Sequence, residues 1–140
     1  MKIKLPTTRY YGSKRKLIEW IWECILSERL HFESVLDLFG GSGIFSYFSK
    51  KQGKMVHYND LFRFNYYIGK ALIENRSVIL TEEEARFALS YHDGIDYKNK
   101  ISTHFKDIYF TELENRQIDI ICGNIQSIDC EYKKVYCITF

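Results

Sequence analysis

The sequence predicts an α/β fold built on a pair of parallel strands, and three observations support this. An apolar run over residues 35–39 leads into a turn that contains Gly40, Gly41 and Gly43. A second predicted strand, residues 54–60, ends in an acid. The spacing between the two runs leaves room for one helix. A strand, a crossover helix and a second strand in this order form the βαβ unit of parallel sheets.

An amphipathic helix precedes this unit. Its apolar residues recur at helical spacing and share one face: Ile18, Ile21, Trp22 and Ile25. The basic run 14–16 stands at the start of this helix, where cations oppose the helix dipole. The sequence therefore predicts either that an anion is held there or that the charges spread into solvent.

The first strand and the turn after it are expected to form a ligand site. We expect these apolar residues to be buried in a parallel sheet: Val35, Leu36, Leu38 and Phe39. The glycines that follow allow a sharp bend and the close approach of a ligand. A helix that begins near Ser42 directs its free N–H groups at that ligand. It is predicted to run over 44–52, with Gly53 as its C-terminal stop.

The acids near the turn restrict the kind of ligand. The glycines do not follow the dinucleotide pattern G-x-G-x-x-G, since position 46 is Ser, which argues against a pyrophosphate. Asp37 suits a cationic ligand or one rich in donors, and Asp60 can accept hydrogen bonds from ribose hydroxyls. S-adenosylmethionine carries all of these groups. Two alternatives stay open: Asp37 orients the turn backbone, and Asp60 caps the next helix.

Three blocks of the chain resemble the Dam-like class of DNA adenine-N6 methyltransferases of restriction–modification systems. They are Arg9–Leu17, Asp37–Gly43 and Asn59–Asp60. The resemblance implies a Rossmann-like methyltransferase fold, S-adenosylmethionine as cofactor, double-stranded DNA as substrate and a cognate restriction endonuclease as partner. It also implies that Tyr10 packs on the cofactor and that Lys14 reaches its carboxylate. The expected cofactor-binding residues are Tyr10, Lys14, Asp37, Phe39, Gly40, Gly41, Ser42, Gly43 and Asp60.

The chain departs from this family in one block. The family's Asp-Pro-Pro-Tyr motif holds a flipped adenine, but the only proline here is Pro6. We therefore expect the chain to be the N-terminal portion of a methyltransferase, with a truncated fold. It is expected to contain no catalytic residue and to be inactive alone. Two alternatives remain: a methyltransferase that acts on RNA or a small molecule, and a non-enzymatic remnant that binds cofactor or DNA.

The distal half is predicted to be helical. Residues 1–80 are expected to form the cofactor-binding core, and residues 81–140 the start of a target-recognition region without nameable DNA contacts. Capping boxes at Thr81 and Thr111 predict two helix starts. Residues 92–99 are predicted to be a loop, and the segment from 131 a strand or a helix. The second helix carries an apolar stripe of Ile118, Ile121, Ile125 and Ile128.

Composition narrows the function classes. The net charge of +2 is too small to indicate nucleic acid, but basic residues gather before residue 20, which makes that end the candidate DNA side. The four cysteines and four histidines lack ligand spacing, so no metal is expected. No signal peptide or long apolar run is seen, and we expect a cytoplasmic protein with no membrane contact. Phe62, Tyr66 and Tyr67 are predicted to form a core face, with stacking on bases as the alternative.

Overall fold

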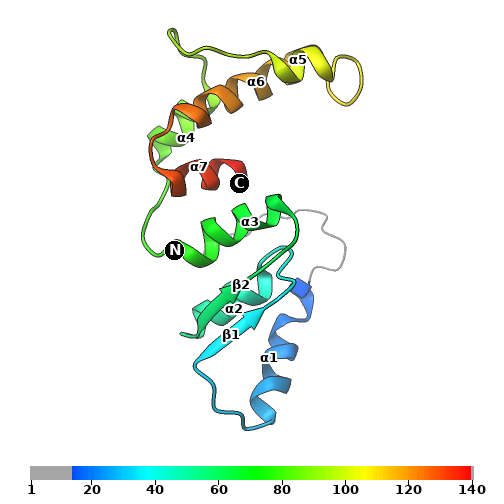
Figure 1. Ribbon diagram of the computed structural model, residues 1–140, viewed down its shortest axis with the longest axis vertical. Coiled ribbons are helices and arrows are strands. Elements are labelled where there is room, and N and C mark those ends of the chain that lie inside the picture. Colours follow the sequence, from blue (N-terminus) through cyan, green and yellow to red (C-terminus); the bar gives the residue numbers. More distant parts are fainter. Residues whose placement is uncertain (1–13, 140) are drawn as a thin grey trace. The chain divides into compact units, whose positions relative to one another are not determined.

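The computed structural model describes residues 14–139 and divides into two compact units. The first unit ends at Arg76, and the second runs from Ser77 to Ile138. Each is described by itself (Figure 1). The elements of the first unit are η1 (Lys14–Lys16), α1 (Ile18–Ser27), β1 (Ser34–Asp37), α2 (Ile44–Lys51), β2 (Met55–Tyr58), α3 (Arg63–Gly69) and the π-helical turn η2 (Lys70–Glu74).

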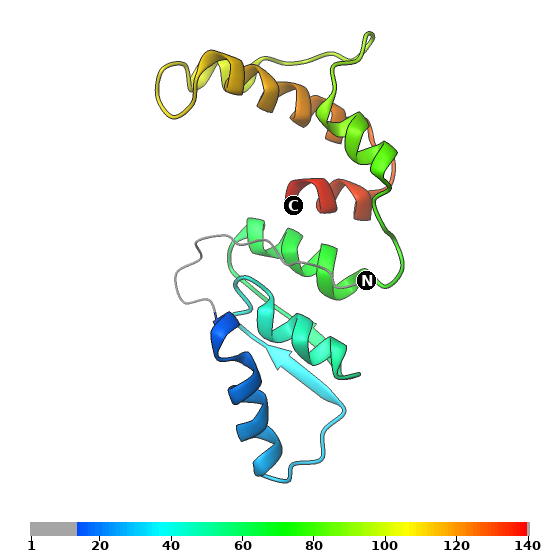
Figure 2. The ribbon, with the colours of Figure 1, turned by 180° about the vertical axis from the view of Figure 1, so that it is seen from behind.

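The predicted βαβ unit is confirmed as a two-stranded parallel sheet. Strand β1 pairs with β2 in a register that runs from Ser34 opposite Met55 to Asp37 opposite Tyr58. Helix α2 connects the strands and lies across one face of the pair (Figures 1 and 2). It ends one residue before the predicted end, and Gly53 follows with a φ of +80°. A residue in this left-handed conformation often ends a helix, and glycine is favoured at such a position.

The expected burial of the first apolar run is wrong for three of its residues. Leu36, Leu38 and Phe39 are 62%, 52% and 80% exposed. In the part of the chain that the structure describes, the sheet has two strands, and α2 covers one face of them. Because successive side chains of a strand point to opposite faces, Val35 is half-buried while its neighbour Leu36 remains in water.

The amphipathic prediction for α1 is confirmed. Trp22 is 7% exposed and packs edge-on against Phe32 and Phe48, with ring centroids 5.9 and 5.6 Å apart. Phe45 lies on the same indole at 6.4 Å. Aromatic contacts of this kind add to the free energy of burial. The helix is therefore attached to α2 by a cluster of four aromatic rings.

The aromatic stripe predicted for α3 does not face the core. Phe62 and Tyr66 are 65% and 51% exposed, and the inner face instead begins with Asn65. The Asn65 amide donates to the Asp60 carboxylate at 2.8 Å, which turns that side of the helix inward. The apolar cluster beneath the helix consists of Ile68, Leu72 and Ile73, with Tyr47, Val56 and Tyr58 packed against it.

Lys50 of α2 stabilises the end of the turn η2. Its ammonium donates to the carbonyl oxygens of Leu72, Ile73 and Asn75 at 2.9, 2.8 and 2.5 Å. Such carbonyls lack helical partners at a helix end. Burial, and to a smaller extent the charge of Arg76, lowers the pKa of Lys50 from its usual value.

The second unit is helical, as expected. Its elements are α4 (Glu82–Leu89), α5 (Lys100–His104), α6 (Glu112–Ser127) and α7 (Glu131–Thr139). Both predicted capping boxes are present, at Thr81 and at Thr111, and residues 92–99 carry no helix or strand. The segment from 131 is a helix rather than a strand. None of the described helices is both long and apolar enough to span a membrane.

Polar residues dominate the buried side of α6. Asn115, Asp119 and Asn124 are 1%, 5% and 0% exposed, whereas Ile125 is the one buried member of the predicted isoleucine stripe. The Asn124 amide donates to three carbonyls at the end of α4 at 2.6 to 3.1 Å and accepts the Tyr97 hydroxyl at 2.8 Å. Buried amides with such partners stabilise and orient the segments that they join.

Candidate functional site

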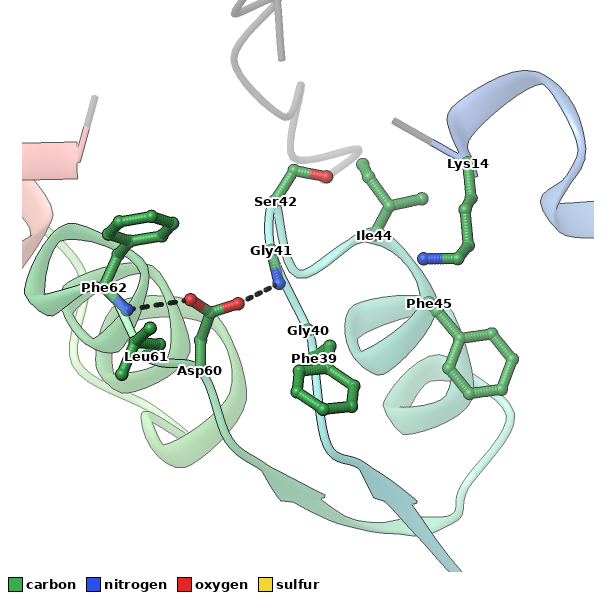
Figure 3. Close-up of a pocket in the computed structure, with 10 residues that line it drawn as sticks. All are labelled: Lys14, Phe39, Gly40, Gly41, Ser42, Ile44, Phe45, Asp60, Leu61 and Phe62. Atoms are coloured by element: carbon green, nitrogen blue, oxygen red, sulfur yellow. Dashed lines mark hydrogen bonds between the residues drawn. The ribbon is translucent and has the colours of Figure 1, made fainter. Parts of the chain in front are cut away.

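A cavity of about 390 Å³ lies where the chain leaves β1 and β2. Ligands of open parallel sheets bind outside the carboxyl ends of the strands, and small-molecule sites have volumes in this range. Figure 3 shows the side chains around it. The described residues that line it are Lys14, Phe39, Gly40, Gly41, Ser42, Ile44, Phe45, Asp60, Leu61 and Phe62.

The turn after β1 adopts a conformation that favours glycine. Gly41 and Gly43 have φ values of +53° and +68°, in the left-handed region. Gly43 is also the N-cap of α2, and no side chain among the described residues caps this end. The first N–H groups of the helix therefore remain donors for a ligand.

Two residues at the end of β2 hold the backbone of Gly41 through hydrogen bonds: Tyr58, the last residue of the strand, and Asp60, two residues later. The Gly41 N–H donates to Asp60 Oδ2 at 2.8 Å, and the Gly41 carbonyl accepts the Tyr58 hydroxyl at 2.7 Å. Both distances are those of good hydrogen bonds. The glycine turn is thus fixed in place before any ligand binds.

The ring of Tyr58 also accounts for the absence of a side chain at Gly40 and Gly69. A Cβ on Gly40 would lie 2.1 Å from Tyr58 Cε2, and a Cβ on Gly69 would lie 2.4 Å from Tyr58 Cδ1. Both distances are far shorter than carbon atoms allow, so the ring occupies the space that two missing side chains leave. The small size of Gly40 is therefore needed for the tyrosine ring, and the expectation that Gly40 allows the close approach of a ligand stays a prediction.

Among the described residues, three donors lie within 3.0 Å of the Asp60 carboxylate. They are the N–H of Gly41 at 2.8 Å, the N–H of Phe62 at 3.0 Å and the amide of Asn65 at 2.8 Å. Burial alone raises the pKa of Asp60, but hydrogen bonds from the Asn65 side chain and from the backbone of Phe62, Gly41 and Leu61 outweigh it and lower the pKa below its usual value. A carboxylate offers about four acceptor positions, and these partners occupy most of them. The bond to Phe62 shows that Asp60 also orients the start of α3.

The structure brings six of the nine predicted site residues to the cavity. Lys14 extends its ammonium from η1 toward the start of α2 (Figure 3). Asp37 does not line the cavity; its carboxylate accepts the Ser46 hydroxyl at 2.6 Å, which favours the alternative that it orients the strand-to-helix turn. Gly43 shapes the turn without lining the cavity, and Tyr10 lies outside the described residues.

Sequence reasoning missed the apolar walls of the cavity. Four lining residues directly follow the two motifs: Ile44, Phe45, Leu61 and Phe62. Their position next to the glycine turn and next to Asp60 was the signal that could have identified them. Together with the lysine, the carboxylate and the N–H donors, they suit a ligand with an anionic end, hydroxyl groups and a flat apolar part. Among the described residues, no group of three His, Cys, Asp or Glu could hold a metal ion.

Comparison with known proteins identifies the family of the chain. The family model of the D12 class of N6 adenine-specific DNA methyltransferases matches residues 10–138. The type II methyltransferase M2.HphI of Haemophilus parahaemolyticus is 33% identical over 131 residues, which are 94% of this chain and 37% of that protein. The chain thus spans little more than a third of the relative's length. No solved structure gives a significant match. The family match covers nearly the whole chain, which therefore belongs to the D12 class of N6 adenine-specific DNA methyltransferases.

Proposed function

We propose that the cavity binds S-adenosylmethionine and that the chain serves the methylation of adenine N6 in double-stranded DNA. The observation that carries the proposal is the meeting of Lys14, the glycine turn and Asp60 around one cavity. Family membership supports the reaction type. The geometry supports the cofactor, because each part of that molecule meets a chemically suitable group.

The donor set fits S-adenosylmethionine group by group. The Lys14 ammonium and the uncapped N-terminus of α2 suit the carboxylate of the methionine part. The Asp60 carboxylate lines the cavity and suits the ribose hydroxyls as an acceptor. Phe39 and Phe62 supply flat apolar surface for the adenine.

In this proposal the protein's part in the reaction is to bind and orient. The cofactor, when bound, supplies an activated methyl group on a sulfonium. The hydrogen bonds that lower the pKa of Asp60 stabilise its ionised form, in which both carboxylate oxygens are acceptors. The fixed Gly41 peptides keep the turn in one conformation, which reduces the entropy cost of ordering the cofactor.

The residues that hold the target adenine are proposed to lie outside this sequence. Pro6 is its only proline, so no Asp-Pro-Pro-Tyr block occurs in it. We assign residues 1–80 to the cofactor-binding part of a Rossmann-like methyltransferase fold and residues 81–140 to the start of target recognition. M2.HphI is a type II methyltransferase, and a restriction endonuclease of matching specificity is the partner that we propose by analogy.

Titration calorimetry with two ligands tests the cofactor assignment. Lys14→Gln should weaken binding of S-adenosylmethionine by about tenfold, since it removes a charge-assisted hydrogen bond. The same variant should bind adenosine as the wild type does, because adenosine has no carboxylate. Lys16→Gln is the matched control, since Lys16 does not line the cavity.

A second substitution tests the ribose contact. Asp60→Ala should weaken the binding of both ligands, because it removes the acceptor and releases the Gly41 N–H. Unchanged affinity for S-adenosylmethionine in both Lys14→Gln and Asp60→Ala would refute the assignment of this cavity.

A further inference from the structure

Two serines of α2 are fully buried, and their hydroxyls have different partners. Ser46 and Ser49 are both 0% exposed. The Ser49 hydroxyl donates to the Phe45 carbonyl of its own helix at 2.9 Å, which is a common bond for a serine inside a helix. The Ser46 hydroxyl instead donates to the Asp37 carboxylate at 2.6 Å. Ser46 therefore joins the first turn of α2 to the last residue of β1.

This bond closes the segment that contains the glycine turn. Asp37 and Ser46 stand at its two ends, and between them Gly41 and Gly43 have left-handed backbone conformations. Glycines give a segment many accessible conformations, so a bond across its ends restricts the position and direction of the helix that follows. The distance of 2.6 Å is typical of a hydroxyl that donates to a carboxylate, which is a stronger bond than one between neutral groups.

The bond acts at a different place from the two that hold Gly41. Asp60 and Tyr58 fix the middle of the turn, whereas Ser46 fixes the start of the helix. The N–H groups at this start are the donors that the proposed function assigns to the cofactor carboxylate. Ser46 is uncharged and is not among the described residues that line the cavity. Its effect on a ligand therefore passes through the direction of these N–H groups.

We propose that Ser46 is a positioning residue for the cofactor: its bond to Asp37 directs the N-terminus of α2 at the carboxylate of S-adenosylmethionine. The inference rests on the proposed function, because it takes that molecule as the ligand. Direction matters since hydrogen bonds weaken steeply when donor and acceptor are misaligned. Asp37 then has an indirect part in binding, in place of the direct contact with a cationic ligand that the sequence suggested.

The binding of two ligands to Ser46→Ala, measured by titration calorimetry, tests this role. One ligand is S-adenosylmethionine, and the other is 5′-methylthioadenosine, which keeps the adenosine and the sulfur but has no amino-acid end. Ser46→Ala should weaken binding of the first by about fivefold and bind the second as the wild type does. Ser49→Ala is the matched control and should bind both as the wild type does. It deletes an equally buried hydroxyl of the same helix whose partner lies within that helix.

Variants of Asp37 test the same bond from its other end. Asp37→Ala removes the acceptor and should reproduce the loss seen in Ser46→Ala. Asp37→Asn keeps an oxygen acceptor for the hydroxyl and should restore most of the affinity for S-adenosylmethionine. A direct contact between the Asp37 charge and the cofactor predicts the opposite, a loss in Asp37→Asn without a loss in Ser46→Ala.

The outcomes separate this inference from the cofactor assignment. A loss confined to S-adenosylmethionine in Ser46→Ala and Asp37→Ala supports it. Equal losses for both ligands overturn it, since they would reflect only a destabilised turn. Unchanged affinity in Ser46→Ala, while the wild type binds S-adenosylmethionine, overturns it and leaves the proposed function intact. A wild type that binds neither ligand refutes the proposed function and this inference together.

Discussion

Removing the hydroxyl of Tyr58 tests whether a fixed glycine turn matters for cofactor binding. Tyr58→Phe keeps the ring in the space between Gly40 and Gly69 and deletes one donor, which lies 2.7 Å from the Gly41 carbonyl. The turn then keeps the bond from the Gly41 N–H to Asp60 and the backbone bond from the Gly40 N–H to the Asn59 carbonyl. We expect a modest decrease in stability and a separate decrease in affinity for S-adenosylmethionine.

The magnitude follows from the value of one hydrogen bond. A neutral bond of this kind contributes about 1 kcal/mol net. If this hydrogen bond stabilises the binding-competent conformation of the turn relative to open conformations, then deleting it lowers the equilibrium constant for the competent conformation by at most about fivefold at 25 °C. Because apparent affinity scales with the competent fraction, the dissociation constant of Tyr58→Phe should rise by no more than that factor.

Titration calorimetry and thermal unfolding on the same samples measure both effects. The ring's own contribution is measured by a double-mutant cycle with Gly40→Ala, whose Cβ would otherwise meet the ring at 2.1 Å. Combining Gly40→Ala with Tyr58→Ala should cost less stability than the sum of the two single changes. Gly53→Ala is the control, since a Cβ there meets nothing within 4 Å and the cost comes from its φ of +80°. A cofactor affinity of Tyr58→Phe equal to that of the wild type would refute the role assigned to the hydroxyl.

Three further predictions concern stability. Lys50→Met should lower the free energy of unfolding by about 2 kcal/mol, because three carbonyls at the end of η2 lose their donor, while Lys51→Met should have little effect in the same denaturant titration. Asn124→Leu should cost about 2–3 kcal/mol by leaving buried carbonyls without a donor, measured by thermal unfolding. The pKa of Asp60 is lowered in the folded chain, so its stabilisation is present above the unfolded value near 3.8 and is lost as pH falls through the folded pKa. Denaturant midpoints should therefore decline below about pH 5, and Asp60→Asn should flatten that decline.

Elements whose signals are local could be predicted from the sequence. The capping boxes at Thr81 and Thr111 form because a side chain and a backbone N–H three residues apart satisfy each other. The stop at Gly53 depends on one backbone conformation. The parallel pairing of the strands followed from the length of the connection, which is too long for a hairpin and right for a helix.

Features set by long-range partners could not be predicted from periodicity. The inner face of α3 is chosen by the bond between Asn65 and Asp60, which overrides the aromatic spacing of Phe62 and Tyr66. The buried side of α6 is polar because Asn124 satisfies carbonyls that end another helix. A hydrophobic pattern carries no information about such donors and acceptors, since their partners lie more than thirty residues away for Asn124.

The two residues that hold Gly41 contribute differently to the proposed site. Tyr58 does not line the cavity and acts through the turn, because its hydroxyl donates to the Gly41 carbonyl and its ring packs against Gly40, Gly69 and the apolar cluster. Asp60 acts on the turn and also lines the cavity, where its carboxylate is the proposed acceptor for the ligand. In the proposed complex, the Asp60 carboxylate therefore accepts hydrogen bonds both from a cofactor hydroxyl and from the Gly41 N–H, which belongs to the turn that contacts the rest of the cofactor. Removing the Asp60 carboxylate should consequently affect both ends of the ligand, whereas removing the Tyr58 hydroxyl should affect only the part that contacts the turn.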